Sequence, residues 1–89
     1  MELKPEILEL LSSGKDNIRE IRLTYRNGGQ VKGAVLRLRV KTGTKPIVKL
    51  VIDKHDPRPG ERSRHRAVLE HLTEIWITAA DGTEHLFRE

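Results

Sequence analysis

The sequence predicts a mainly β fold with one N-terminal α-helix, in which five to six antiparallel strands form a strongly bent sheet or a partly open barrel. The first observation behind this is an Asn-Gly-Gly run within residues 25–30, which separates two stretches of β-type residues, 18–25 and 31–41. Asn and Gly accept positive φ at little cost, so this run predicts a tight hairpin turn. The second is a change of apolar parity inside the second stretch, which indicates a bulge or sharp bend.

Residues 3–12 are expected to form a short helix that packs on the sheet. Apolar side chains recur there at helical spacing, and Pro5 suits the first helical turn, where its missing N–H costs nothing. A helix of about ten residues is marginal by itself, so its apolar stripe needs a tertiary partner.

The first two strands alternate between a buried and a solvated side. Ile21, Leu23 and Tyr25 share one side of the first strand, and Val31 and Gly33 would face them across the turn. Beyond Gly33, which we take as the place of the bend, the apolar side is expected to switch. The residues after the switch are apolar Leu36, Leu38 and Val40, alternating with basic Arg37, Arg39 and Lys41.

The later elements follow from composition. A nearly continuous apolar run predicts a central strand, and the Pro- and Gly-containing stretch after it predicts a loop. Apolar residues recur at helical spacing from residue 64 onward, so a helix over 64–74 is an alternative to two strands. The expected order is a turn at 41–46, a strand at 47–53, a loop at 55–62, strands at 65–70 and 74–79 around a turn at 71–73, a turn at 80–83 and a strand at 84–88.

Length and composition favour one domain over residues 1–89 that binds or assembles rather than catalyses. The chain has 89 residues, no cysteine, 34% charged residues, a net charge of +4 and a pI near 9.8. A chain this short forms a small core and leaves little room for a deep active site. No stretch is typical of a membrane span or a signal segment, and the absence of cysteine suits a reducing compartment, so we expect a cytoplasmic protein.

The segment from Ile21 to Gly33 resembles the first motif of the Sm-like small barrels, relatives of the SH3-type barrels. It contains an alternating strand, an Asn-Gly turn and a Gly early in the next strand. Residues 66–77 fit the later strand-turn-strand part, and the Rho-inhibitor branch and the WYL effector domains are similar in the same way. The resemblance implies an Sm/SH3-like barrel. The Asp and Asn that line the uridine pocket in Sm proteins are absent from residues 41–46, so no family binding residue is carried over.

Two groups of cations are candidates for contacting a nucleic-acid backbone, because guanidinium groups pair bidentately with phosphate oxygens. One group alternates along the second strand and is joined by Arg22 and Arg26 if the bend leaves the strand faces contiguous. The other lies in and after the loop. A solvated surface that only keeps the chain soluble is the competing interpretation. The candidate binding residues are Arg37, Arg39, Lys41, Arg58, Arg62, Arg64 and Arg66.

Other chemistry has little support in the sequence. Tyr25, Trp76 and Phe87 occupy apolar-pattern positions and are expected in the core, which leaves no aromatic platform for base stacking. The four histidines lack ligand spacing, so we expect no metal, and no nucleophile–base pair or phosphate-cradling loop predicts an enzyme, a cofactor or a small-molecule substrate.

The sequence therefore predicts a non-catalytic module that contacts RNA or DNA, RNA being favoured. The alternative is a protein-interaction or regulatory module that self-associates through an edge strand or the helix, with the charge incidental. An amphipathic final strand at residues 84–88 is the feature that favours this alternative.

Overall fold

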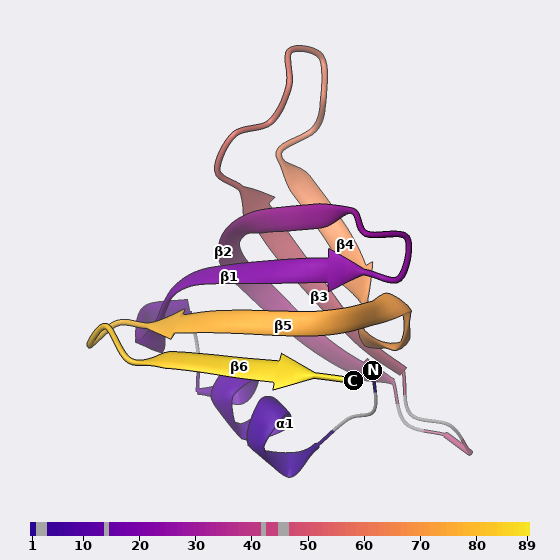
Figure 1. Ribbon diagram of the computed structural model, residues 1–89, viewed down its shortest axis with the longest axis vertical. Helices are drawn as coiled ribbons and strands as arrows, with labels where there is room; N and C mark the ends of the chain where they lie inside the picture. Colours follow the sequence, from indigo (N-terminus) through magenta and orange to yellow (C-terminus); the bar gives the residue numbers. More distant parts are fainter. Residues whose placement is uncertain (2–3, 14, 42, 45–46) are drawn as a thin grey trace.

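The computed structural model, which describes residues 1, 4–13, 15–41, 43–44 and 47–89, contains one helix and one six-stranded antiparallel sheet (Figure 1). The strand order is β4-β3-β2-β1-β5-β6, so β4 and β6 are free edges and the sheet is not closed into a barrel. The predicted mainly β class is confirmed. The elements are α1 (Pro5–Ser12), η1 (Lys15–Asn17), β1 (Ile18–Tyr25), β2 (Gln30–Lys41), β3 (Ile47–Lys54), β4 (Arg64–Val68), η2 (Leu69–His71), β5 (Leu72–Ala79) and β6 (Glu84–Arg88).

The predicted first hairpin is confirmed with its register. Leu23 faces Val31 and Ile21 faces Gly33. Gly28 has φ 87°, the left-handed conformation that the turn requires. The Asn27 side chain accepts a 2.9 Å bond from the amide of residue 29, which holds the turn closed.

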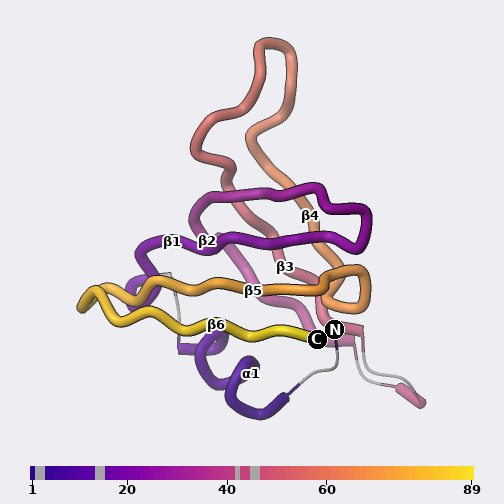
Figure 2. The backbone as a smooth tube through the Cα atoms, viewed as in Figure 1, coloured from indigo at the N-terminus to yellow at the C-terminus, as the bar shows by residue number. Residues whose placement is uncertain are grey.

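β2 bends sharply and carries the sheet from one layer to a second (Figure 2). The register against β3 shifts between Val35 and Arg37, so the bulge lies at Leu36 and not at Gly33, where the sequence placed it. Gly33 instead allows a close approach between β2 and β3. A Cβ there would lie 2.1 Å from the carbonyl oxygen of Asp53, so only glycine allows the two strands this close. Past the bulge Leu38 packs against the core, whereas Leu36 and Val40 are about 40% exposed, contrary to the expected apolar side.

The core lies between the two layers, and α1 closes it at one end (Figure 1). The helix begins at Pro5, while Leu3, the predicted start, lies outside the described residues. Its buried residues Ile7 and Leu11 join the core cluster, so the predicted packing of the stripe on the sheet is confirmed. The fully buried large side chains are Ile7, Ile21, Leu23, Leu50, Ile52, Leu72, Ile75 and Ile77.

The helix considered over 64–74 is absent, and strands flank a single 3₁₀ turn as the favoured alternative predicted. The turn comes two residues earlier than expected, at Leu69–His71, so β5 begins at Leu72. Leu69 and Leu72 are three residues apart, and both are buried because a 3₁₀ turn brings side chains at this spacing to the same side. This spacing explains the helical pattern in the sequence. The predicted turn at 41–46 falls partly outside the described residues.

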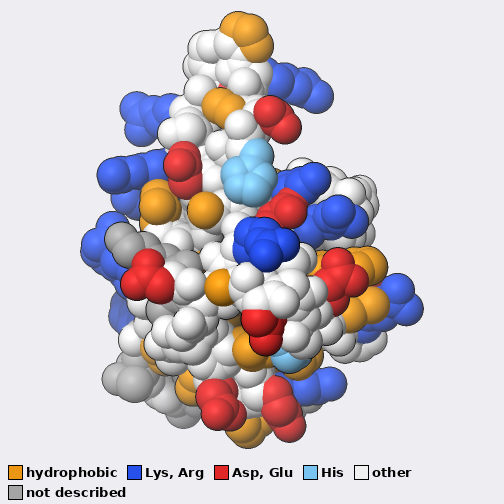
Figure 3. Space-filling model, turned by 90° about the vertical axis from the view of Figure 1, so that its left-hand side faces the viewer, with side chains coloured by type: hydrophobic (Ala, Val, Ile, Leu, Met, Phe, Trp, Pro, Cys, Tyr) orange, Lys and Arg blue, Asp and Glu red, His pale blue; other side chains and the backbone are white. Residues whose placement is uncertain are grey.

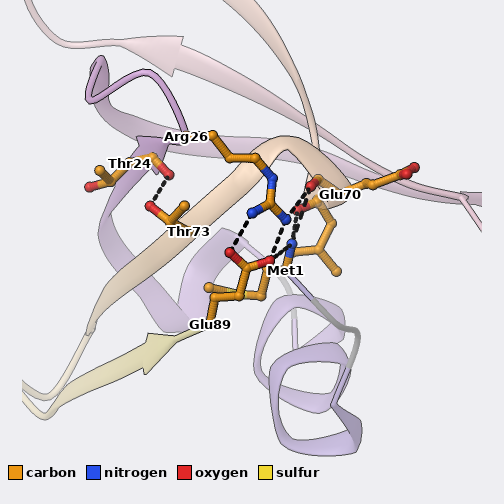
Figure 4. A network of polar contacts seen from close by, with 7 residues as sticks. Met1, Thr24, Arg26, Glu70, Thr73 and Glu89 are labelled. Atoms are coloured by element: carbon orange, nitrogen blue, oxygen red, sulfur yellow. Dashed lines mark hydrogen bonds and ion pairs between the residues drawn. The ribbon is translucent and has the colours of Figure 1, made fainter.

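The first and last residues meet beside η2 (Figure 4). The Met1 α-amino group donates to the carbonyls of Leu69 and Glu70, both at 3.2 Å, and lies 3.4 Å from a carboxylate oxygen of Glu89. Arg26 donates to both oxygens of that carboxylate and to the Glu70 carbonyl. Hydrogen bonds from Arg26 lower the pKa of Glu89. These contacts anchor the end of β6 against the end of β1.

No helix within the described part of the chain is long and apolar enough to cross a membrane.

Candidate nucleic-acid interface

Cations from both predicted groups meet on the outer side of β2, β3 and β4. Directly paired residues of neighbouring strands present their side chains on the same face of a sheet. β3 lies between β2 and β4, so its residues join the basic side chains of both strands into one surface. We call this surface the basic face; its cations are Arg37, Arg39, Lys41, Lys49, Arg64 and Arg66.

The register arranges the basic face in rows that run across the strands. One row joins Arg37, Val51 and Arg66, and the next joins Arg39 and Lys49. Successive cations along one strand are two residues apart, which is roughly 6.6 Å. All six cations of the basic face are exposed.

Val51 shows how closely the first row packs. It points to the outer side of β3, yet only 7% of its surface is exposed. Its direct neighbours on the two flanking strands are Arg37 and Arg66, whose long aliphatic stems can cover it while the guanidinium groups stay in water. The charged ends therefore extend over an apolar centre.

The basic face differs from the outer side of β1, β5, β6 and the start of β2, which we call the paired face. There, Lys32 lies 3.3 Å from Glu20, and Arg88 lies 3.1 Å from Glu74. Among the described residues, no cation of the basic face has an ion-pair partner within 4.0 Å, and the rows contain one acid, Asp53, opposite Arg64. Unpaired cations stay available to an external polyanion.

Arg58 and Arg62 lie apart from the sheet, in the long loop that projects between β3 and β4. The loop forms the upper protrusion in Figure 1, and Figure 3 shows Lys and Arg side chains on it and along the left-hand edge of the molecule. Both arginines are exposed. At the base of the loop Lys54 pairs with Glu61, and this hydrogen bond lowers the pKa of Glu61. Of the predicted residues, five lie on the basic face and these two lie beside it.

A shallow hollow of about 390 Å³ lies at the far end of the basic face. Arg39, Lys41 and Lys49 surround it, and Val40 and Ile47 complete its lining. Three cations around one hollow can contact a phosphate group from several sides.

Lys49 is the residue of the basic face that sequence reasoning missed. It interrupts the apolar run of β3 and is exposed between buried Val48 and Leu50. This single polar position within the apolar run of residues 47–52 is the available signal, since a buried strand has no need of a lysine. Arg22 and Arg26, considered as an extension of the cation stripe, lie elsewhere: Arg22 stacks on Trp76, and Arg26 bonds Glu89.

Trp76 is not in the core, contrary to the prediction. It lies on the paired face, directly between Arg22 on β1 and Leu86 on β6, and the Arg22 guanidinium carbon is 5.5 Å from the centre of its ring. Tyr25 and Phe87 do pack against the core as expected. β5 has apolar residues on both of its sides, so the sequence does not indicate which side is buried.

Tyr25 and His65 join the two layers across the open end of the core. The Tyr25 hydroxyl lies 2.5 Å from Nε2 of His65, and the two rings meet edge to face. Burial lowers the pKa of His65, with a smaller effect in the same direction from Lys54. Burial also raises the pKa of Tyr25. Both groups are therefore neutral near pH 7, and their contact fixes β4 relative to β1.

Within the described residues, no group of three or more His, Asp or Glu side chains is arranged to hold a metal ion. A second hollow of about 340 Å³ lies at the base of the long loop, with Lys32, Lys54 and Arg58 facing Asp56 and Glu61. Its opposite charges compensate each other locally.

Comparison with known proteins gives no match for this chain among family models, curated proteins or solved structures.

Proposed function

We propose that this protein is a non-catalytic module that contacts the sugar-phosphate backbone of nucleic acid, RNA in the first place, through the basic face. The observation that carries the proposal is the set of six exposed cations in register on β2, β3 and β4, none with an ion-pair partner among the described residues. Cations of this kind displace condensed counterions from a polyanion, and this release drives binding.

Backbone contact is favoured over base recognition. The rows of the basic face contain arginine, lysine, aliphatic residues and Asp53 but no aromatic residue, while Tyr25 and Phe87 pack on the core and Trp76 lies on the paired face. Proteins that recognise single-stranded bases generally stack them on aromatic side chains. Affinity is therefore expected to vary little between homopolymers such as poly(U) and poly(A).

The test is a salt titration of RNA and DNA binding. Replacement of Arg37, Arg39 and Lys41 with Ala removes three phosphate contacts, so the slope of log affinity against log salt should fall by about 2 to 3. The matched control removes three cations from the paired face, Arg22, Lys32 and Arg88, and should leave the slope unchanged. Absence of binding at low salt, or equal slopes for both triple variants, would contradict the proposal.

The proposal extends to the fold family of the protein and to its cellular location. The bent β2, the early hairpin and the single 3₁₀ turn between β4 and β5 support an open variant of the Sm/SH3-like barrel. The absence of cysteine fits a reducing compartment, so we place the protein in the cytoplasm.

A further inference from the structure

The two free edges of the sheet differ in a way that bears on self-association. On β6, the amide of Glu89 bonds the carbonyl of Thr73 at 2.9 Å, and the amide of Ala79 bonds the carbonyl of Thr83 at 2.8 Å. Hydrogen-bonded pairs alternate along an antiparallel ladder, so residues 83, 85, 87 and 89 point their backbone groups at β5. The N–H and C=O groups of residues 84, 86 and 88 therefore point to the open edge.

We propose that two copies of this chain pair through β6, antiparallel about a two-fold axis at Leu86. This register places Leu86 opposite Leu86 of the second copy and Glu84 opposite its Arg88. All three positions with outward backbone groups then meet as hydrogen-bonded pairs, which is the arrangement that a two-fold symmetric strand pair needs. We assign the partner strand to a second copy of this chain because the five residues of β6 are complementary to themselves in this register.

The side chains on this edge support the pairing. Leu86 is 41% exposed, and its neighbour on the sheet is Trp76, so the dimer would join two apolar pairs into one continuous row. Glu84 and Arg88 share that outer face, and opposite charges directly across an antiparallel pair are favourable. Arg88 lies 3.1 Å from Glu74 on β5, yet 68% of its side chain stays exposed.

The edge is open within the described part of the chain. No hydrogen bond from another segment reaches the backbone of residues 84, 86 or 88 there. α1 lies beside β6 in Figure 1, but it turns Ile7 and Leu11 into the core and makes no hydrogen bond to the strand. An added strand would continue the sheet beyond β6.

The other edge opposes the same pairing. On β4, the amide of Lys54 bonds the carbonyl of Ser63, so by the same alternation Arg64, Arg66 and Val68 point their backbone groups outward. A two-fold pair centred there would place Arg66 opposite Arg66, and like charges directly opposite are unfavourable. Charged edge strands are a common protection against edge-to-edge pairing. Self-association is therefore directed to β6.

The test is sedimentation equilibrium over a wide concentration range, with a charge-exchange series on β6. Glu84→Arg and Arg88→Glu each place like charges opposite one another in both symmetry-related pairs, so each should weaken the dimer about tenfold. The double variant restores opposite charges and should recover the wild-type dimer. Glu9→Arg, which makes the same charge change on the exposed side of α1, should leave the dimer unchanged.

Leu86→Pro gives a second, independent arm. It removes the central outward N–H, and proline is tolerated on a free edge, so the variant should stay folded by thermal unfolding and sediment as a monomer. A wild-type chain that remains monomeric at all concentrations would overturn the proposal. A dimer unaffected by both the single charge reversals and Leu86→Pro, or growth into open filaments, would overturn it as well.

Discussion

The basic face and the paired face belong to the same sheet and both carry many charges, but they differ in whether acids lie next to the cations. On the paired face, acids stand close to cations, as Glu20 does to Lys32 and Glu74 to Arg88. On the basic face, the cross-strand neighbours of the cations are apolar or basic, as Val51 and Lys49 are, with the one exception of Asp53 opposite Arg64. Strand register, more than total charge, decides whether a cation is compensated within the protein or is left for a partner.

At Gly33, three residues before the bulge in β2, the backbone of β2 lies very close to that of β3, so a side chain at this position should have the largest effect. Gly33→Ala places a Cβ 2.1 Å from the Asp53 carbonyl, and the backbone has to move. We expect a loss of roughly 3 kcal/mol in the free energy of unfolding, at the upper end for overpacking. Chemical denaturation measures it, and Gly43→Ala, whose Cβ would meet nothing within 4 Å, is the control. Equal midpoints for the two variants would refute the role of Gly33.

A carboxylate at Val51 should make the basic face resemble the paired face. Val51→Glu sets an acid directly between Arg37 and Arg66 without removing a cation. The salt slope of nucleic-acid binding should fall by roughly 1 to 2, because those guanidinium groups gain an internal partner. Thr78→Glu adds the same charge to the paired face, where its cross-strand neighbours are Glu20 and Glu84, and should leave the salt slope unchanged. Binding that is insensitive to Val51→Glu would place the contact elsewhere.

The contact of Tyr25 with His65 links the two layers and predicts a pH dependence. Because burial lowers the pKa of His65 in the folded protein, the unfolded chain binds more protons below about pH 6.5. Stability should therefore fall as the pH drops through that value towards the lowered pKa, with a slope of at most about 1.4 kcal/mol per pH unit.

Unfolding free energies measured across this range should depend less on pH in His65→Gln, which keeps a polar partner for Tyr25. Identical profiles for the two proteins would show that His65 is not responsible, since His55, His71 and His85 are present in both.

The smallest expected effect concerns Arg22 on the paired face. Its guanidinium lies over the Trp76 ring, and Arg22→Ala should cost about 0.5 to 1 kcal/mol in the free energy of unfolding. Trp76 fluorescence should report the change. In a Trp76→Leu background the same substitution should have no measurable cost, and a persistent cost would assign the effect of Arg22 to another contact.

Local patterns predicted most elements because their causes are local. The Asn-Gly-Gly turn, the alternation of β1 and the apolar run of β3 each depend on residues adjacent in sequence. The segment 64–74 was harder, because a buried Leu pair across a 3₁₀ turn repeats at nearly helical spacing. The bulge was assigned to Gly33 and not to Leu36 because a glycine in a strand indicates either a bulge or a close backbone approach.

The candidate site was predicted residue by residue but not as a surface. Arg37, Arg39, Lys41, Arg64 and Arg66 were identifiable as basic strand or loop residues, and Lys49 was overlooked inside an apolar strand. Trp76 was assigned to the wrong side, because an apolar residue on each side of β5 gives no alternation to follow.

The amino-acid sequence by itself determined the mainly β class, the first hairpin and the packing of the helix stripe, since turn chemistry and apolar periodicity act over a few residues. Only the tertiary structure decided that β3 joins two distant sets of cations into one face, and that β6 remains an open edge. Those outcomes depend on strand order and register, which are set by contacts between residues far apart in the chain.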